Sequence, residues 1–166
     1  MPRHPSLIAL SHDHHHGLAL ALRCRKQALG QMKPLGMQGL KERTNEVSDF
    51  VSKMLEPHFK AEEEVLFPLM RSCIPEGDSL IENLSEEHRQ IRGMTARLES
   101  SANLSKGLFD LGDLLERHIR REERELFPLF EKHVTAGDAE KVRTQIEKVL
   151  ASGPSRSAIQ NRKSKI

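Results

Sequence analysis

Apolar residues recur every three or four positions along four long stretches of this chain, separated by short runs rich in glycine and proline. This spacing places the apolar side chains on one face of an α-helix, and the abundant Leu, Glu, Lys, Arg and Gln residues favour helix. The alternation typical of strands is absent from the sequence. The pattern predicts helices near 6–31, 39–72, 78–102 and 106–133, followed by a shorter helix near 137–151.

Short links between the four long helices predict an all-α fold: an up-down-up-down four-helix bundle with a short additional C-terminal helix. Three prolines, Pro57, Pro68 and Pro128, lie inside the predicted helices. A proline in a helix removes one backbone hydrogen bond, and its ring crowds the preceding turn. Because the leucine pattern continues past Pro68 and Pro128, we interpret these two as kinks rather than as helix ends.

One stretch of the sequence is written twice. HFKAEEEVLFPL spans 58–69 and HIRREERELFPL spans 118–129, with seven of twelve positions identical. Upstream of these, LSHDH at 10–14 corresponds to LSEEH at 84–88. Two copies are too few for a solenoid, so the repeat predicts a small domain with pseudo-twofold symmetry.

The predicted apolar faces contain polar residues, at least one on each long helix. They are His14, His58, Glu62, His88, His118 and Glu122. A His and a Glu four positions apart lie on the same side of a helix and can reach one point. A lone histidine on an apolar face is usually a hydrogen-bonded core residue, but here each element recurs in both halves. We therefore predict that the six side chains converge on one axis.

Burial of this set has a large energetic cost. An ionised carboxylate buried without a partner costs several kcal/mol, and two of them would rival a total stability of about 5–15 kcal/mol. Protonated carboxyls bonded to the histidines could offset the cost. Two divalent cations would offset it better, because carboxylates can bridge two metals while imidazoles fill the outer positions.

The ordered residues resemble the hemerythrin-like HHE cation-binding domain over roughly 6–133. The resemblance implies a hemerythrin-like bundle that holds two non-haem iron ions, oxo- or hydroxo-bridged. Members of that family bind oxygen, sense oxygen or redox state, or handle iron. It also implies a set of metal ligands, which are His14, His58, Glu62, His88, His118 and Glu122.

Two of these assignments leave alternatives open. Alignment on Leu-Ser selects His14 within HDHHH, and His15 is the other candidate. Symmetry of the repeat selects Glu122, whereas oxygen-carrying hemerythrins place this carboxylate five residues after the histidine, which favours Glu123. The carriers also have a second histidine four positions after the one matching His88, where this chain has Arg92. Water, Glu63 or Glu123 could supply the missing ligand.

Composition adds few constraints on function. Net charge is +2 with 30% charged residues, which gives no strong attraction to nucleic acid. No apolar stretch is long enough to span a membrane, and the start, MPRHPSLIAL, lacks signal-peptide features. We expect a cytoplasmic protein with no nucleic-acid or membrane partner. Its cysteines, Cys24 and Cys73, are expected to be reduced and packed on apolar stripes.

The chain divides into a metal-binding bundle over 1–151 and a basic tail, predicted to be disordered, over 152–166. The leading functional hypothesis is a di-iron protein that reacts with oxygen or a related small oxidant, as a sensor or iron-handling module. The first alternative is a small di-iron redox enzyme that consumes peroxide or nitric oxide. The second is a bundle that binds zinc, or no metal, and acts through protein partners. Whether the protein is an enzyme is left open.

Overall fold

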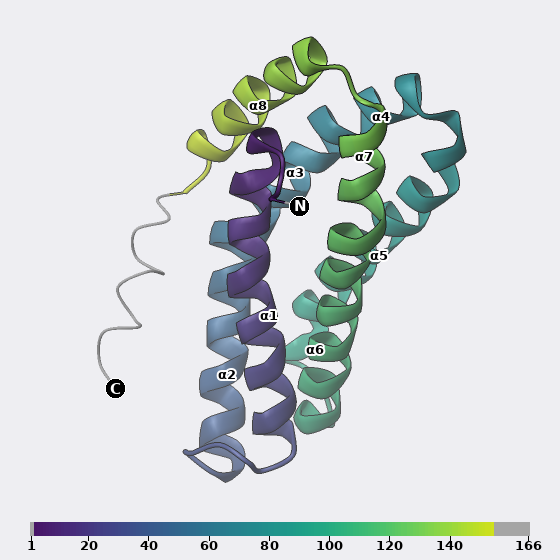
Figure 1. Cartoon of the computed structure of the whole chain (residues 1–166). Coiled ribbons are helices and arrows are strands. Elements are labelled where there is room, and N and C mark those ends of the chain that lie inside the picture. The colour runs from purple at the N-terminus through teal and green to yellow at the C-terminus, as the bar shows by residue number, and fades with distance from the viewer. Residues whose placement is uncertain (1, 155–166) are drawn as a thin grey trace.

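The computed structural model describes residues 2–154, and helices account for most of that part of the chain (Figure 1). The elements in chain order are the 3₁₀ turn η1 (Pro5–Leu7), α1 (Ile8–Ala28), α2 (Gly36–Phe50), the π-helical η2 (Val51–Leu55), α3 (Glu56–Ala61), the π-helical η3 (Glu62–Leu66), α4 (Phe67–Cys73), the 3₁₀ turn η4 (Pro75–Gly77), α5 (Asp78–Leu98), α6 (Leu104–Arg121), the π-helical η5 (Glu122–Leu126), α7 (Phe127–His133) and α8 (Ala136–Ala151).

The four predicted long helices and the later short helix are confirmed. The segment predicted over 39–72 is helical without a break from Gly36 to Cys73, and the one predicted over 106–133 runs from Leu104 to His133. No strand occurs among residues 2–154. The chain is therefore an all-helical bundle with an added helix, while the up-down-up-down order of directions stays a prediction.

The three internal prolines each follow a π-helical segment by two residues. The backbone N–H before each proline, on Glu56, Phe67 and Phe127, donates to the carbonyl five residues earlier. A proline lacks an N–H and its ring crowds the carbonyl four residues back, so a wider turn removes the clash. The helical backbone continues past all three prolines, as we expected for Pro68 and Pro128. Because π segments often occur at functional sites, their positions are informative.

Two apolar clusters form the core, and the six predicted site residues lie between them along the helices. In α1, Leu10 belongs to one cluster and Leu20 to the other, with His14 between them. In α5, Leu84 and Ile91 flank His88 in the same way. The bundle therefore has a polar layer enclosed by apolar side chains on both sides.

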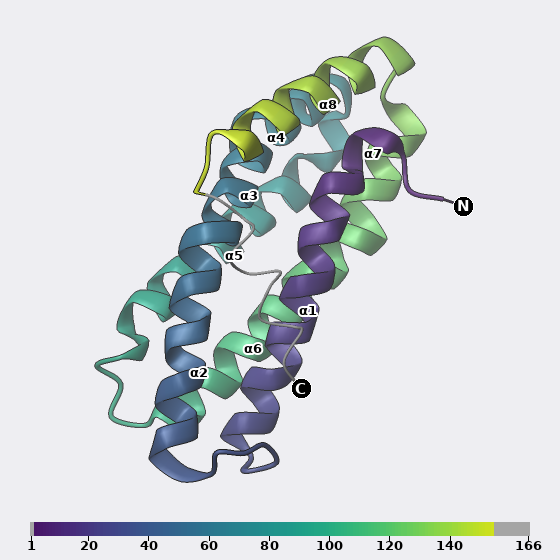
Figure 2. The same ribbon diagram turned by 90° about the vertical axis from the view of Figure 1, so that its left-hand side faces the viewer.

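The helix α8 lies across one end of the bundle, near the start of α1 (Figures 1 and 2). It packs against η1, α3 and η3. Its buried residues Ala139, Val142, Ile146 and Leu150 complete the apolar cluster at that end. This helix thus shields the polar layer from solvent along the bundle axis.

Helices α1 and α6 pack closely because a glycine lies on each contact face. A Cβ at Gly112 would lie 2.7 Å from the carbonyl oxygen of Ala21, and a Cβ at Gly17 would lie 2.6 Å from Ile119. Larger side chains would push these helices apart. The close packing brings His14 of α1 to the same layer as His118 of α6.

Of the two cysteines predicted to be packed on apolar stripes, one is buried and one is exposed. Cys24 is buried, as expected, but Cys73 is exposed because α4 ends at that residue. Most of the basic tail predicted over 152–166 lies outside the described residues. Among the described helices, none is both long and apolar enough to cross a membrane.

Candidate metal centre

All six predicted site residues meet in the polar layer, and each is at most 2% exposed. Four helical stretches supply them. The residues and their elements are His14 on α1, His58 on α3, Glu62 on η3, His88 on α5, His118 on α6 and Glu122 on η5. His15, the alternative to His14, is exposed and lies outside this layer. Both carboxylates begin a π segment, so the wider turn required by the following proline occurs where the glutamates project inward.

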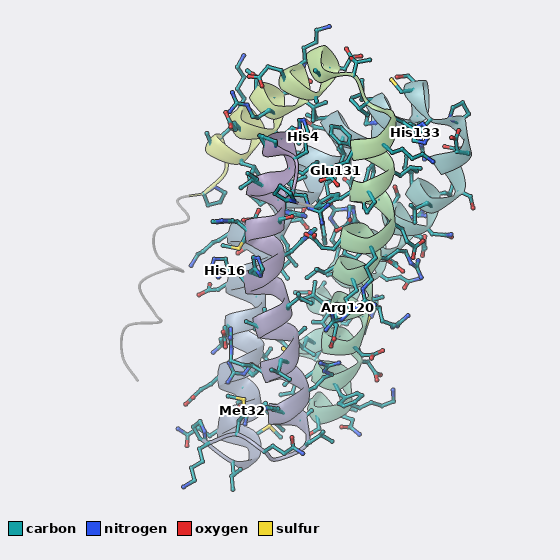
Figure 3. All side chains as sticks on the ribbon, in the orientation of Figure 1. His4, His16, Met32, Arg120, Glu131 and His133 are labelled. Atoms are coloured by element: carbon teal, nitrogen blue, oxygen red, sulfur yellow. The ribbon has the colours of Figure 1, made fainter. Side chains whose placement is uncertain are left out.

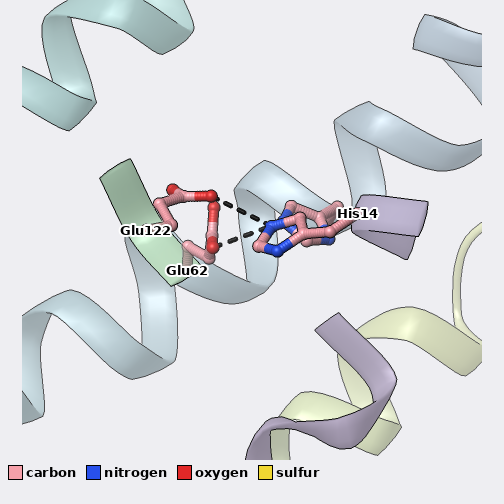
Figure 4. A group of neighbouring side chains, drawn as sticks. His14, Glu62 and Glu122 are labelled. Atoms are coloured by element: carbon pink, nitrogen blue, oxygen red, sulfur yellow. Dashed lines mark hydrogen bonds and ion pairs between the residues drawn. The ribbon is translucent and has the colours of Figure 1, made fainter. Parts of the chain in front are cut away.

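The two glutamates face the Nε2 atoms of histidines from both halves of the repeat. Glu122 Oε2 lies 3.0 Å from Nε2 of His14, and Glu122 Oε1 lies 3.2 Å from Nε2 of His118. Figure 4 shows the imidazole of His14 facing the carboxylates of Glu62 and Glu122. Glu62 lies 3.3 Å from Nε2 of His58 and 3.3 Å from Nε2 of His88. Each half therefore supplies a carboxylate that contacts a histidine of the other half.

These contacts define two overlapping groups of potential ligands. One group is His14, His58, Glu62 and Glu122, and the other is Glu62, His88, His118 and Glu122. Within each group the ligand atoms lie within 4.8 Å of one another. Both glutamates belong to both groups, so the arrangement suits two cations side by side that share two carboxylates.

Each histidine contacts a second carboxylate through its other ring nitrogen, Nδ1. The pairs are His14 with Glu123 at 2.7 Å, His58 with Asp13 at 3.1 Å, His88 with Glu63 at 2.8 Å, and His118 with Glu87 at 2.9 Å. In the neutral imidazole, Nδ1–H donates a hydrogen bond to the carboxylate, which leaves the Nε2 lone pair directed into the centre. The four outer carboxylates therefore hold the imidazoles in the tautomer and orientation that a metal requires.

Sequence reasoning missed this outer layer, although the repeat contains a signal for it. Asp13 and Glu87 directly precede the site histidines His14 and His88 in the two halves. Glu63 and Glu123 directly follow the inner glutamates. The outer carboxylates are thus repeated as regularly as the inner residues.

The geometry distinguishes the alternatives that the sequence left open. Glu122 faces the centre, whereas Glu123 lies outside it and accepts from the hydroxyl of Ser11 at 2.7 Å. Glu63 is likewise on the outer side of His88. Glu123 and Glu63 thus contact Nδ1 of His14 and of His88, on the side away from the centre. Arg92 also lies outside and donates to Glu63 through Nη1 at 2.8 Å.

The histidines are more basic than usual despite their burial. Burial lowers the pKa of His58, but the carboxylates of Glu62 and Asp13 outweigh it and raise that pKa to about 10. Burial is likewise outweighed by carboxylates at His14, His88 and His118, whose pKa values are all raised. Without a metal, protons on these imidazoles balance the carboxylate charge.

The inner glutamates stay ionised for the complementary reason. Burial, and the neighbouring charge of Glu122, favour a higher pKa for Glu62, but the imidazoles of His58 and His88 lower it. Burial also opposes ionisation of Glu122, yet His118, His14 and His88 hold its pKa well below the usual value. The centre therefore offers two anionic carboxylates to a cation.

The hydrogen bonding of the inner residues also indicates that they fit metal ions. Both oxygens of Glu62, both oxygens of Glu122, and Nε2 of His88 and His118 are buried without a hydrogen bond of acceptable geometry. Buried polar groups are almost always hydrogen-bonded, so a cluster left without such bonds needs another partner. Imidazole nitrogens and carboxylate oxygens are ligands that iron, zinc and manganese accept.

Comparison with known proteins agrees with this geometry. The family model of the hemerythrin HHE cation-binding domain matches residues 6–130. The chain belongs to this family. The match covers all six residues of the hemerythrin-like centre and ends before α8.

One curated relative is much longer than the stretch that it shares with this chain. A DNA nickase from Nostoc sp. (strain PCC 7120 / SAG 25.82 / UTEX 2576) is 31% identical over 99 residues, which cover 58% of this chain and 28% of that protein. The match therefore spans less than a third of the relative. No solved structure matches the chain.

Proposed function

We propose that the chain holds a non-haem di-iron centre that reacts with oxygen or a related small oxidant, as an oxygen or redox sensor or as an iron-handling module. The observation that supports this most directly is that Glu62 and Glu122 each belong to both ligand groups. Two shared carboxylates favour a pair of ions over a single one. The ligands of one ion would be His14 and His58, and those of the other His88 and His118, with both glutamates common to the two.

Iron suits the donor set better than zinc does. Here the six side chains divide into two groups that share carboxylates, an arrangement found in dinuclear iron and manganese bundles. Two iron ions would supply one- and two-electron redox chemistry toward oxygen or peroxide.

The residues around the centre would bind, orient and shield the ions. The outer carboxylates hold the protons on Nδ1 of the four histidines, which keeps each Nε2 available as a ligand. Phe127 stacks on His14 with ring centroids 5.3 Å apart, and Phe59 stacks on His88 at 3.8 Å. These rings exclude water from the sides of the centre.

An enzymatic role is the second candidate, and one observation favours it. A surface cleft of about 860 Å³ is lined in part by His14 and Glu123, so a molecule larger than oxygen could approach the outer side of one metal ligand. A small di-iron redox enzyme that consumes peroxide or nitric oxide would need such a route. DNA cleavage is named for the Nostoc relative, and the small share of it that matches does not support the transfer of that activity.

Metal analysis with an optical spectrum tests the proposal. The protein is purified without added metal, loaded anaerobically with Fe²⁺, freed of unbound metal and exposed to air. We expect about two irons per chain and near-ultraviolet bands typical of bridged ferric ions. One tightly bound zinc per chain, with no iron taken up, would contradict the proposal, as would a chain that binds no metal. Steady turnover of peroxide or nitric oxide would favour the enzymatic alternative over a sensor.

A further inference from the structure

Arginines lie behind the outer carboxylates Glu123, Glu63 and Glu87. The pairs are Arg3 with Glu123, Arg92 with Glu63, and Arg121 with Glu87. A guanidinium bonded to a carboxylate restricts both its position and its rotation, because the donors form a rigid planar fork. The orientation of each associated imidazole therefore depends on an arginine two contacts away.

Arg3 contacts the His14 side of the centre in two ways. Its Nη2 bonds to the carboxylate of Glu123 and, at 3.3 Å, to the backbone carbonyl of the same residue. Its guanidinium also lies over the ring of Phe127, 5.0 Å from the centroid. Phe127 in turn is nearly parallel to the His14 ring, with an angle of 14° between them. Arg3 thus contacts both Glu123 and Phe127, and each of these two side chains contacts the imidazole of His14.

Arg92 makes the equivalent arrangement in the other half. It bonds to Glu63, and its guanidinium lies 5.2 Å from the ring of Phe59, which stacks on His88 at an angle of 20°. The two arginines differ in the secondary structure of the backbone that carries them. Arg92 lies within α5, whose hydrogen bonds fix its position, whereas Arg3 precedes the first helical turn.

The N-terminal arm, residues 2–4, carries Arg3 and is attached to η5 and α7 mainly through side chains. Arg3 Nη1 donates to Glu131 Oε1 at 3.1 Å, and the backbone N–H of His4 donates to the same oxygen at 2.9 Å. Figure 3 shows His4 and Glu131 next to each other at this point. Arg3 is therefore held by two carboxylates, the Glu123 carbonyl and the Phe127 ring, and not by the hydrogen bonds of a helix.

The arm also borders the cleft that is lined in part by His14. That cleft is lined by Arg3, Ser11, His14, His15, Glu123 and Lys132, among others. Two further clefts of the described chain reach the outer carboxylates Asp13 and Glu63, but neither is lined by a histidine that faces the centre. Of the histidines that face the centre, His14 is thus the one that lines a described cleft.

We propose that Arg3 is a positioning residue for His14, and that it closes the route by which small molecules reach the metal position held by His14 and His58. The inference rests on the two-metal function proposed above. Arg92 positions His88 in the same manner, but the cleft that Arg92 lines reaches Glu63 and is not lined by a histidine of the centre. The two halves of the centre consequently share one ligand plan and differ in access.

Arg3→Gln and Arg92→Gln form a matched pair of variants that tests both parts of this proposal. Stepwise Fe²⁺ affinities are measured anaerobically by competition with a colorimetric chelator. The rate of azide binding to the oxidised iron-loaded protein is measured by stopped-flow absorbance. Circular dichroism and melting of the metal-free chains check that both variants fold. Arg3→Lys is the conservative variant, which keeps a charge that can reach Glu123.

We expect Arg3→Gln to weaken one of the two iron affinities by about tenfold and leave the other within about twofold, since loss of an outer partner typically has an effect of this size. The rate constant for azide binding should rise about fivefold or more, and Arg3→Lys should restore most of the wild-type behaviour. Arg92→Gln should weaken one affinity to a similar degree and leave the azide rate within about twofold.

Unchanged affinities in Arg3→Gln would overturn the positioning role. An azide rate that rises equally in Arg92→Gln, or in neither variant, would overturn the assignment of the route. Failure of the proposed function would appear separately, as a wild-type chain that does not bind two irons, and would overturn this inference with it.

Discussion

Replacement of Glu122 by Gln is the sharpest perturbation of the centre, because this carboxylate contacts more of the histidines than any other group. Its oxygens lie 3.0 Å from His14, 3.2 Å from His118 and 3.8 Å from His88. The amide has nearly the same shape but has one oxygen instead of two and no charge. Because Glu122 belongs to both ligand groups, we expect bound iron to fall from about two ions per chain toward none.

The same change has a calculable effect on the metal-free chain. Removal of one partner of a buried ion pair costs about 3–5 kcal/mol, and we take the lower figure because loss of the Glu122 charge also relieves its repulsion of Glu62. For a domain of this size, about 3 kcal/mol lowers the melting temperature by roughly 6–12 °C. This estimate of the change in melting temperature applies at pH values where Glu122 and its histidine partners are both charged.

The effect depends on pH in a direction set by the pKa shifts. The pKa values of His14 and His118 are raised from 6.5, so their contribution to stability is complete below about pH 6.5 and is lost as pH rises through the folded-state values. The pKa of Glu122 is lowered from 4.5, so its contribution is present above about pH 4.5 and is lost as pH falls through its folded-state value. The destabilisation should be largest between these limits and smaller in alkaline solution.

The assay compares iron content and metal-free melting for Glu122→Gln with two neighbouring variants. Glu123→Gln removes an outer carboxylate and should keep two ions at saturating iron, with about 10–100-fold weaker affinity for one of them. Glu125→Gln changes an exposed residue and should behave as wild type. Two tightly bound irons in Glu122→Gln would refute the shared-ligand arrangement, and a melting difference that grows toward alkaline pH would refute the charge assignment.

Three further outcomes follow from the structure. Metal binding should release protons from the histidines and tighten as pH rises, because their raised pKa values keep protons where metals bind; titration in weakly buffered solution with a pH indicator measures both effects. In the folded chain a thiol reagent should label exposed Cys73 and spare Cys24, since burial raises the pKa of Cys24 to about 12; mass spectrometry after brief labelling distinguishes the two. A chain truncated after Ser152 should keep both irons and its melting temperature, because the sequence beyond it contains no His, Cys, Asp or Glu, and loss of iron on truncation would show that the tail contributes to the centre.

The repeat and the apolar periodicity were sufficient to predict the helices and the six inner residues. A residue on the apolar stripe of an amphipathic helix must face the core, whichever way the helices are then packed. His14, His58 and Glu62 could therefore be predicted as buried without any knowledge of their neighbours. The prolines could be interpreted as interruptions within a helix because the leucine pattern continued beyond them. The sequence alone did not reveal that the backbone accommodates them by π turns at Glu62 and Glu122.

The outer layer depended on tertiary structure, because its contacts join residues far apart in the chain. Glu123 is bonded to His14, 109 residues away, and Glu63 to His88, 25 residues away. Adjacent residues on a helix point about 100° apart, so Glu122 and Glu123 cannot both face the centre. Periodicity alone could not decide which one does, since either could lie on the edge of the stripe. Only the packing of α1 against α6 and η5 places Glu123 beside Nδ1 of His14 and Arg3 behind it, and this packing determines how one half of a symmetric centre differs from the other.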